Sequence, residues 1–170
     1  MDPSDTTADE HIRPATAEER ADIRAMHAAN RRAWDEYLTR EVARARRFKT
    51  SLCVAMLDLD HFKEYNDRFG HQAGDRLLKE SAARWQERMR DTDLLARYGG
   101  DEFALALVDC GLDEAIELLD RLRAATPEEE HSSAGVVSWD GTEGELDLVA
   151  RADRALYEAK NNGRDRVVRA

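Results

Sequence analysis

The feature that most constrains the fold is a short apolar run in the first half of the chain. Nearly every residue from 51 to 57 is apolar, and the run ends in two acidic residues, Asp58 and Asp60. A strand that is buried on both faces of a sheet has such a continuous pattern, whereas a strand with one solvent-facing side alternates. The run therefore predicts a central β-strand over 51–57, with helices covering both faces of its sheet.

The rest of the chain supplies the helices and the neighbouring strands. Thr16 and Glu19 have the spacing of a capping box, and apolar residues at helical spacing continue to about Phe48, as one long helix or two abutting ones. Gly70 and Gly74 are expected to bracket a polar turn. The remaining pattern predicts a helix over 75–90, strands over 94–98 and 102–108 joined by a Gly-Gly hairpin, a helix over about 115–122, a strand over 134–139, a helix over about 148–159 and a short strand over 166–168. The expected fold class is α+β, an α/β sandwich in which helices flank a mixed sheet of about five strands.

At 170 residues the chain is about one domain long. We expect residues 1–15 to form a flexible acidic tail and residues 16–48 a helical segment that leads into the domain and belongs to it. Residues 49–170 then form the main domain, which carries the candidate functional residues described below.

Composition excludes several classes of function. The net charge of −10 argues against a nucleic-acid polymer as partner, because such binding relies on clustered Lys and Arg. No apolar run approaches the ~20 residues of a membrane span. The first 16 residues lack the basic start and apolar stretch of a secretory signal, so we expect a cytoplasmic protein without a membrane anchor.

Two acidic pairs lie at the ends of apolar strands, Asp58 with Asp60 after the first strand and Asp101 with Glu102 in the hairpin. If the hairpin pairs beside the central strand, Asp58 and Asp101 meet, and their repulsion calls for a cation. Hard oxygen ligands suit Mg²⁺, which leaves coordination positions open for substrate phosphates. The pattern is thus typical of a metal-dependent phosphoryl or nucleotidyl transferase. The alternative is that a Gly-Asp sequence is merely a good turn, but the coincidence of both pairs weakens it.

Three separated motifs resemble those of the GGDEF family of diguanylate cyclases. Residues 97–103, Arg-Tyr-Gly-Gly-Asp-Glu-Phe, resemble the family signature, and residues 58–75 resemble the stretch found upstream of it. Residues 151–164 resemble the closing segment. The resemblance covers roughly residues 30–168, and three motifs in order at the right spacing are far more specific than one hairpin. It implies a palm-like nucleotide cyclase fold.

The resemblance implies a metal site and a reaction. Asp58 and Asp101 would ligate Mg²⁺, or Mn²⁺ as an alternative ion, together with the backbone carbonyl of Leu59, and Glu102 would assist as a catalytic residue. The implied reaction condenses two GTP molecules into cyclic di-GMP and two pyrophosphates. Because one domain holds one GTP, two copies must face each other in a homodimer, which need only be transient.

The same resemblance implies the substrate contacts. Asn66 and Asp75 match positions that bind the guanine edge, and Asp75 favours GTP because a subgroup that accepts adenine carries serine there. Bare backbone at Gly99 and Gly100 would let the nucleotide approach the turn closely, a role compatible with ordinary turn geometry. The remaining implied substrate contacts are Phe62 and the phosphate-binding cations Lys63, Lys160 and Arg164.

A second site is implied upstream of the hairpin. Arg90 and Asp93 form an R-x-x-D pattern that ends shortly before Gly99, as in the family's inhibitory product site, and Arg121 is a further candidate contact. Alone, such a pattern would more often be an arginine at a helix end followed by a turn.

One segment departs from the family pattern. Before Asn30 the family usually has an Asp-Leu-Thr-Gly-Leu turn, whereas residues 23–29 here lack glycine and favour continuous helix. This departure supports an alternative hypothesis: a weak or inactive GGDEF module that binds GTP or cyclic di-GMP and signals through protein contacts. An enzyme with a different cyclic dinucleotide product and a purely structural protein are further alternatives, and they fit less well.

Overall fold

The computed structural model describes residues 17–170, with side chains from residue 30 onward. The elements in chain order are α1 (Ala17–Phe48), β1 (Leu52–Leu59), α2 (Phe62–Phe69), α3 (His71–Gln86), β2 (Leu94–Gly99), β3 (Glu102–Val108), α4 (Leu112–Ala124), β4 (Ser132–Ser138), α5 (Glu145–Asn161) and β5 (Val167–Arg169). The expected tail over residues 1–15 and the Thr16 cap lie outside the described residues.

The five strands form one mixed sheet in the order β2-β3-β1-β4-β5. β1 lies at the centre and pairs antiparallel with both β3 and β4, whereas β4 and β5 pair in parallel. All eight residues of β1 are buried, as the continuous apolar run predicted. The predicted fold class is confirmed.

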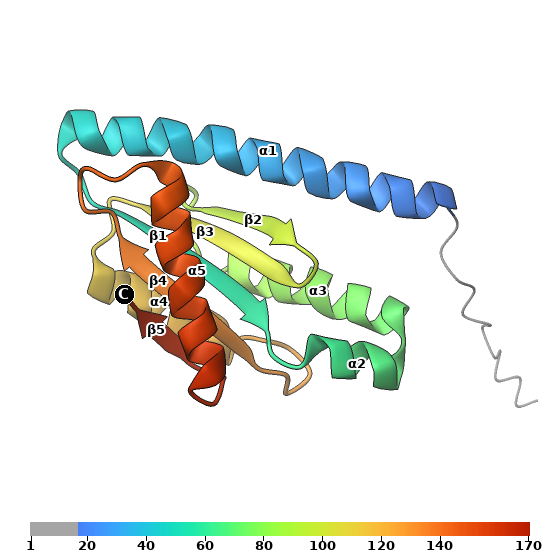
Figure 1. Cartoon of the computed structure of the whole chain (residues 1–170). Helices are drawn as coiled ribbons and strands as arrows, with labels where there is room; N and C mark the ends of the chain where they lie inside the picture. Colours follow the sequence, from blue (N-terminus) through green and yellow to red (C-terminus); the bar gives the residue numbers. More distant parts are fainter. Residues whose placement is uncertain (1–16) are drawn as a thin grey trace, which may run out of the picture.

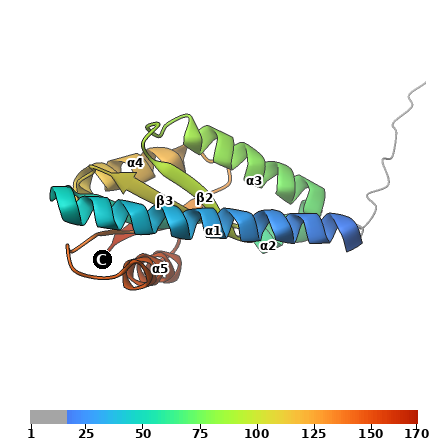
Figure 2. The ribbon, with the colours of Figure 1, turned by 90° about the horizontal axis from the view of Figure 1, so that it is seen from above.

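Helices cover both faces of the sheet, so each face has its own core (Figure 1, Figure 2). On one face, α3 and α4 pack Leu77, Trp85 and Leu119 against the sheet. On the other, α1 and α5 contribute Trp34 and Leu148. Successive side chains of β1 alternate between the two cores, which places Asp58 on the side of α5.

α1 is a single helix rather than two, and no break occurs over residues 23–29. Its later part packs on the sheet through Trp34, Leu38 and Val42, which recur every four residues and are buried. The helix runs along the domain and extends past the sheet at its N-terminal end (Figure 1).

The largest differences from the sequence-based prediction lie at the two ends of α3. The expected polar turn between Gly70 and Gly74 is wrong: α2 fills residues 62–69, Gly70 (φ 87°) separates the two helices, and Gly74 lies inside α3. Only Gly70 makes a turn, since Gly74 is required for close packing instead. α3 also ends at Gln86, before the predicted limit, and residues 87–93 form turns.

Candidate functional site

The antiparallel pairing of β1 and β3 assembles the acidic part of the site. Asp58 lies opposite Glu102 across the strand pair, and Asp101 precedes Glu102 at the hairpin turn. β1 extends through Leu59, so Asp58 is fixed by the sheet rather than following the strand. The Asp58 carboxyl group therefore meets those of Asp101 and Glu102 at one end of the sheet, although Asp58 lies 43 positions before Asp101 in the sequence.

Asp58 is almost completely buried, at 5% exposure. Its Oδ2 atom accepts a hydrogen bond from the ammonium of Lys160 on α5, whereas its buried Oδ1 atom has no hydrogen-bond partner. Burial and the neighbouring Asp101 carboxyl raise the pKa of Asp58 to about 8, and Lys160 opposes this shift. The buried charge is thus only partly compensated by the protein.

Glu102 lies beside an acidic residue of α5 that the sequence reasoning left without a role. Burial and the adjacent Asp153 carboxyl raise the pKa of Glu102 to about 7. Asp153 stands seven positions before Lys160 and hence on the same face of α5, which is the signal that could have identified it.

These residues fit a divalent cation. The unpartnered oxygen of Asp58, the Asp101 carboxyl and the Leu59 carbonyl are the hard donors that Mg²⁺ prefers, with further positions left for water or phosphate. Within residues 30–170, no cluster of three or more His, Cys, Asp or Glu side chains could hold a metal alone. The donor set thus suits an ion that is shared with a phosphorylated ligand.

Asn66 on α2 and Asp75 on α3 come together because Gly74 allows the two helices to approach. A Cβ atom at Gly74 would lie 1.8 Å from Asn66 Oδ1 and 3.1 Å from the Phe62 ring. Asn66 Oδ1 is buried and has no hydrogen-bond partner, while Asp75 is exposed. This pair offers unsatisfied polar groups that a purine edge could use.

Arg97 connects this pair to the acidic residues. Its Nε atom donates a hydrogen bond to the Gly100 carbonyl at 2.9 Å, which ties the hairpin turn. Burial lowers the pKa of Arg97, while the negative charges of Asp75 and Asp101 act in the opposite direction. Sequence reasoning included Arg97 only as part of the signature.

Gly99 and Gly100 are not required by the fold. Neither has a positive φ, and no other chain atom lies within 4 Å of a Cβ built at either position. Ordinary turn geometry therefore does not explain these glycines, which leaves the turn open to an approaching ligand.

The three predicted phosphate-binding cations differ in their contacts. Lys63 is exposed in the first turn of α2, and Lys160 contacts Asp58. Arg164 is exposed in the loop after α5.

Arg90, Asp93 and Arg121 line one cavity of about 200 Å³. Asp93 Oδ2 accepts a hydrogen bond from the backbone N–H of Arg90 at 3.1 Å, and burial raises the pKa of Asp93. The fold thus brings α4 against the turn that follows α3, as the proposed second site requires.

Another cavity, of about 560 Å³, lies between α1, α5 and the sheet. Its lining includes Asp35, Tyr98, Glu102 and Asp153, so it reaches the acidic residues from the side of the helices.

Comparison with protein families decides what kind of domain this is. A family model described as "Diguanylate cyclase, GGDEF domain" matches residues 27–166, most of the chain. The chain belongs to the GGDEF family. In the part of the chain that the structure describes, no helix has the length and apolar character needed to cross a membrane.

Relatives within the GGDEF family include several named cyclases. Diguanylate cyclase DgcP of Pseudomonas aeruginosa is 44% identical over 148 residues, which cover 81% of this chain and 22% of DgcP. Diguanylate cyclase DosC of Escherichia coli K12 is 34% identical over 149 residues, or 81% of this chain and 32% of DosC. The chain therefore spans about a fifth and about a third of these relatives.

Solved GGDEF structures share the fold. The GGDEF domain of DgcB from Caulobacter crescentus in complex with c-di-GMP superposes with a TM-score of 0.76 at 32% identity, covering 82% of this chain and 89% of that one. The active GGEEF domain of a diguanylate cyclase from Vibrio cholerae gives a TM-score of 0.78 at 33% identity, with 82% and 95% coverage.

Proposed function

We propose that this GGDEF domain is a diguanylate cyclase that condenses two GTP molecules into cyclic di-GMP and two pyrophosphates with Mg²⁺. The observation that carries this proposal is the buried Asp58, whose Oδ1 atom has no hydrogen-bond partner and which adjoins Asp101 beneath the open hairpin turn. Relatives named as diguanylate cyclases, up to 44% identical, support the same reaction.

Asp58, Asp101 and the carbonyl of Leu59 would hold the metal. The bound ion would polarise the α-phosphate of GTP and lower the pKa of the attacking 3′-hydroxyl. Glu102 adjoins this group and, with its pKa near 7, can hold or release a proton at neutral pH.

Lys63, Lys160 and Arg164 would pair with the phosphates and stabilise the departing pyrophosphate. Lys160 contacts Asp58 in this structure and can pair with a phosphate oxygen instead when a cation compensates Asp58.

The α2–α3 pair would select guanine. The Asp75 carboxylate suits the N–H donors of the guanine edge, and the unpartnered amide oxygen of Asn66 would supply a second contact beside Phe62.

Catalysis requires two copies of the domain facing each other, because each would contribute one GTP. We place the reaction in the cytoplasm, where GTP is available. The cavity lined by Arg90, Asp93 and Arg121 would bind cyclic di-GMP and limit the reaction.

The proposal is tested by incubating the purified protein with GTP and Mg²⁺ and separating the products. We expect cyclic di-GMP to form at a rate per molecule that rises with protein concentration, since two copies must meet. Asp101→Ala should lower the rate by a factor on the order of 10² or more, as for loss of a main electrostatic group.

Absence of cyclic di-GMP at every protein concentration would refute the cyclase. If the same preparation nevertheless binds GTP or cyclic di-GMP, the domain is a nucleotide-binding module that signals through protein contacts.

A further inference from the structure

The loop that carries Arg164 has an unusual backbone. Gly163, Arg164 and Asp165 have φ values of 104°, 61° and 44°, so three successive residues adopt left-handed conformations. Only glycine adopts this region without cost, and non-glycine residues persist there when their surroundings hold them. Contacts elsewhere in the fold must therefore stabilise the loop.

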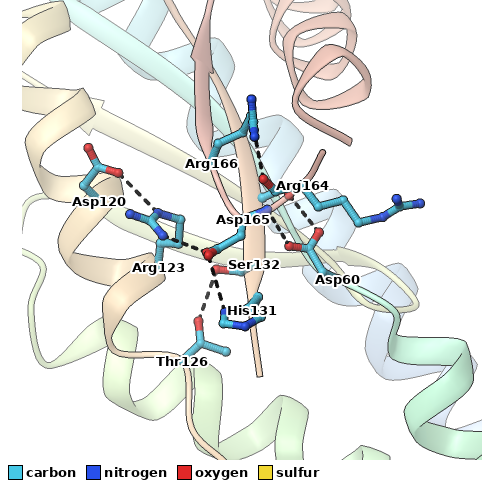
Figure 3. Close-up of polar contacts among 10 residues, drawn as sticks. Asp60, Asp120, Arg123, Thr126, His131, Ser132, Arg164, Asp165 and Arg166 are labelled. Atoms are coloured by element: carbon cyan, nitrogen blue, oxygen red, sulfur yellow. Dashed lines mark hydrogen bonds and ion pairs between the residues drawn. The ribbon is translucent and has the colours of Figure 1, made fainter. Parts of the chain in front are cut away.

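Asp60 supplies one of these contacts. It is only 4% exposed, its Oδ1 atom accepts a hydrogen bond from Ser133 at 2.7 Å, and its Oδ2 atom accepts one from the backbone N–H of Asp165 at 2.9 Å. The Asp60 backbone N–H in turn donates to the carbonyl of His131 at 2.9 Å. Asp60 is thus anchored to β4 and ties the loop to the end of β1 (Figure 3).

Arg123 on α4 supplies the other contact. Its Nη1 atom donates to Asp165 Oδ1 at 2.7 Å, and its Nε atom donates to Asp120 at 3.3 Å. His131 lies on the other Asp165 oxygen, at 3.6 Å. Asp165 is therefore held by its backbone from one side and by its side chain from the other (Figure 3).

The backbone of Arg164 is also held, since its N–H donates to the Ala159 carbonyl at 3.0 Å and its carbonyl accepts from Arg166 Nε at 2.9 Å, whereas its guanidinium takes part in none of these contacts. Its guanidinium points away from the cluster around Asp165 (Figure 3). A backbone hydrogen bond is the main cause that lowers the pKa of Glu64 on α2, and the positive charge of Arg164 adds a smaller effect in the same direction. A rotation of the Asp165 backbone would redirect Arg164, because the two residues share a peptide bond.

We propose that Asp60, Asp165 and Arg123 form a clamp that positions Arg164 for the triphosphate of GTP. The three are positioning residues: none touches the nucleotide, and each acts through Arg164. This inference rests on the proposed function, because it takes Arg164 as a phosphate ligand. It extends the site to α4, which carries no predicted substrate contact.

Arg123→Ala tests the clamp from a position remote from the nucleotide. Dissociation constants are measured with Mg²⁺ for 3′-deoxy-GTP, which lacks the attacking hydroxyl, and for GMP, which lacks the outer phosphates. We expect about tenfold weaker binding of 3′-deoxy-GTP, with GMP binding unchanged within about twofold. Arg164→Ala should likewise weaken binding of 3′-deoxy-GTP and leave GMP binding unchanged. In the double variant, Arg123→Ala should cause no further loss of affinity beyond that of Arg164→Ala.

Arg169→Ala is the matched control, since it removes an exposed ion pair between β5 and Asp113 of α4 without touching the clamp. It should bind both nucleotides as the unmodified protein does. Hydrogen exchange of the Asp165 backbone amide should accelerate in Arg123→Ala but not in Arg169→Ala. This measurement tests whether the loop is loosened without relying on nucleotide binding.

Three results would overturn the clamp: normal 3′-deoxy-GTP binding by Arg123→Ala, an equal loss for GMP, or additive losses in the double variant. Normal binding by Arg164→Ala would overturn it as well. If the unmodified protein bound no guanine nucleotide, the proposed function itself would fail, and this inference with it.

Discussion

At the hairpin turn, two glycines are present that the fold itself does not require. Gly99 and Gly100 have neither a positive φ nor a neighbouring atom that would oppose a side chain. Asp58, in contrast, has an unfavourable effect on folding, because a buried carboxylate with an unpartnered oxygen costs free energy unless it is protonated or bound to a cation. The proposed nucleotide and metal would account for both features, and both can be tested by single substitutions.

Gly100→Ala should leave stability unchanged and lower activity. The added methyl group meets no chain atom, so the free energy of unfolding should change by less than about 0.5 kcal/mol. It would obstruct the nucleotide, and cyclic di-GMP formation should fall by a factor on the order of 10 to 100. Gly144→Ala is the control, because that position is equally open. An unchanged rate in Gly100→Ala would refute the steric role of the glycine.

Asp58→Asn should alter the pH dependence of stability in the absence of metal. The pKa of Asp58 is raised to about 8 in the fold, against about 4 when unfolded, so the folded protein binds more protons between these values. The free energy of unfolding contributed by Asp58 is therefore greatest below pH 4 and falls as the pH rises towards 8.

Thermal unfolding in EDTA at pH 5 and pH 8 measures this effect. We expect the melting temperature to fall less between the two pH values in Asp58→Asn than in the unmodified protein. In a separate measurement at pH 8, with Mg²⁺ and without EDTA, only the unmodified protein should be stabilised. Equal pH slopes in the two proteins would contradict the prediction.

At the scale of elements, close packing of α2 on α3 shapes the predicted guanine contacts. Gly74 lies in α3, where alanine would favour the helix by about 1 kcal/mol, yet a methyl group would overlap Asn66. Gly74→Ala should therefore weaken GTP binding by about tenfold or more, an order-of-magnitude expectation for a misplaced hydrogen-bonding group. Isothermal titration with 3′-deoxy-GTP measures the loss, and retained affinity would show that Asn66 is not a guanine contact.

The turn between α3 and β2 carries Arg90 and Asp93 of the proposed second site. Arg90→Ala should increase late cyclic di-GMP accumulation without changing the initial rate, because product would no longer be held at the cavity that Arg90 shares with Arg121. Full progress curves with measured product affinity check this. Arg84→Ala, which removes an exposed ion pair of α3, is the control. Unchanged curves and affinity in Arg90→Ala would refute the inhibitory role.

Local patterns predicted the elements better than they predicted the contacts between them. The apolar run and the Gly-Gly hairpin predicted β1, β2 and β3, and the pairing of β1 with β3 was the condition on which the acidic site depended. Gly74 was assigned to a turn because its packing partner, Asn66, is set by tertiary structure. The link from Asp60 to Asp165 spans 105 positions, and no local pattern predicts it.

At the scale of the whole molecule, the site draws on both layers of the sandwich. The predicted metal donors come from β1 and from the hairpin turn between β2 and β3. The predicted guanine contacts come from α2 and α3, and Lys160 comes from α5 on the opposite face. Because β1 is paired on both sides and entirely buried, these groups share one rigid frame. Lys160 could be assigned to phosphate from its motif, but its contact with Asp58 emerges only when the layers are assembled.

α1 is uninterrupted, so its N-terminal part joins the domain as one continuous helix without a hinge. An α-helix turns by about 100° per residue, so a twist applied at Ala17 reaches the Trp34 packing surface with its angle preserved. Inserting one residue within 18–29 would rotate the N-terminal end of the helix by about 100° relative to the sheet. Inserting seven residues, about two turns, would restore the original orientation. Any signal transmitted to the domain through α1 would therefore depend on the angle at which the N-terminal end of the helix is rotated relative to the sheet.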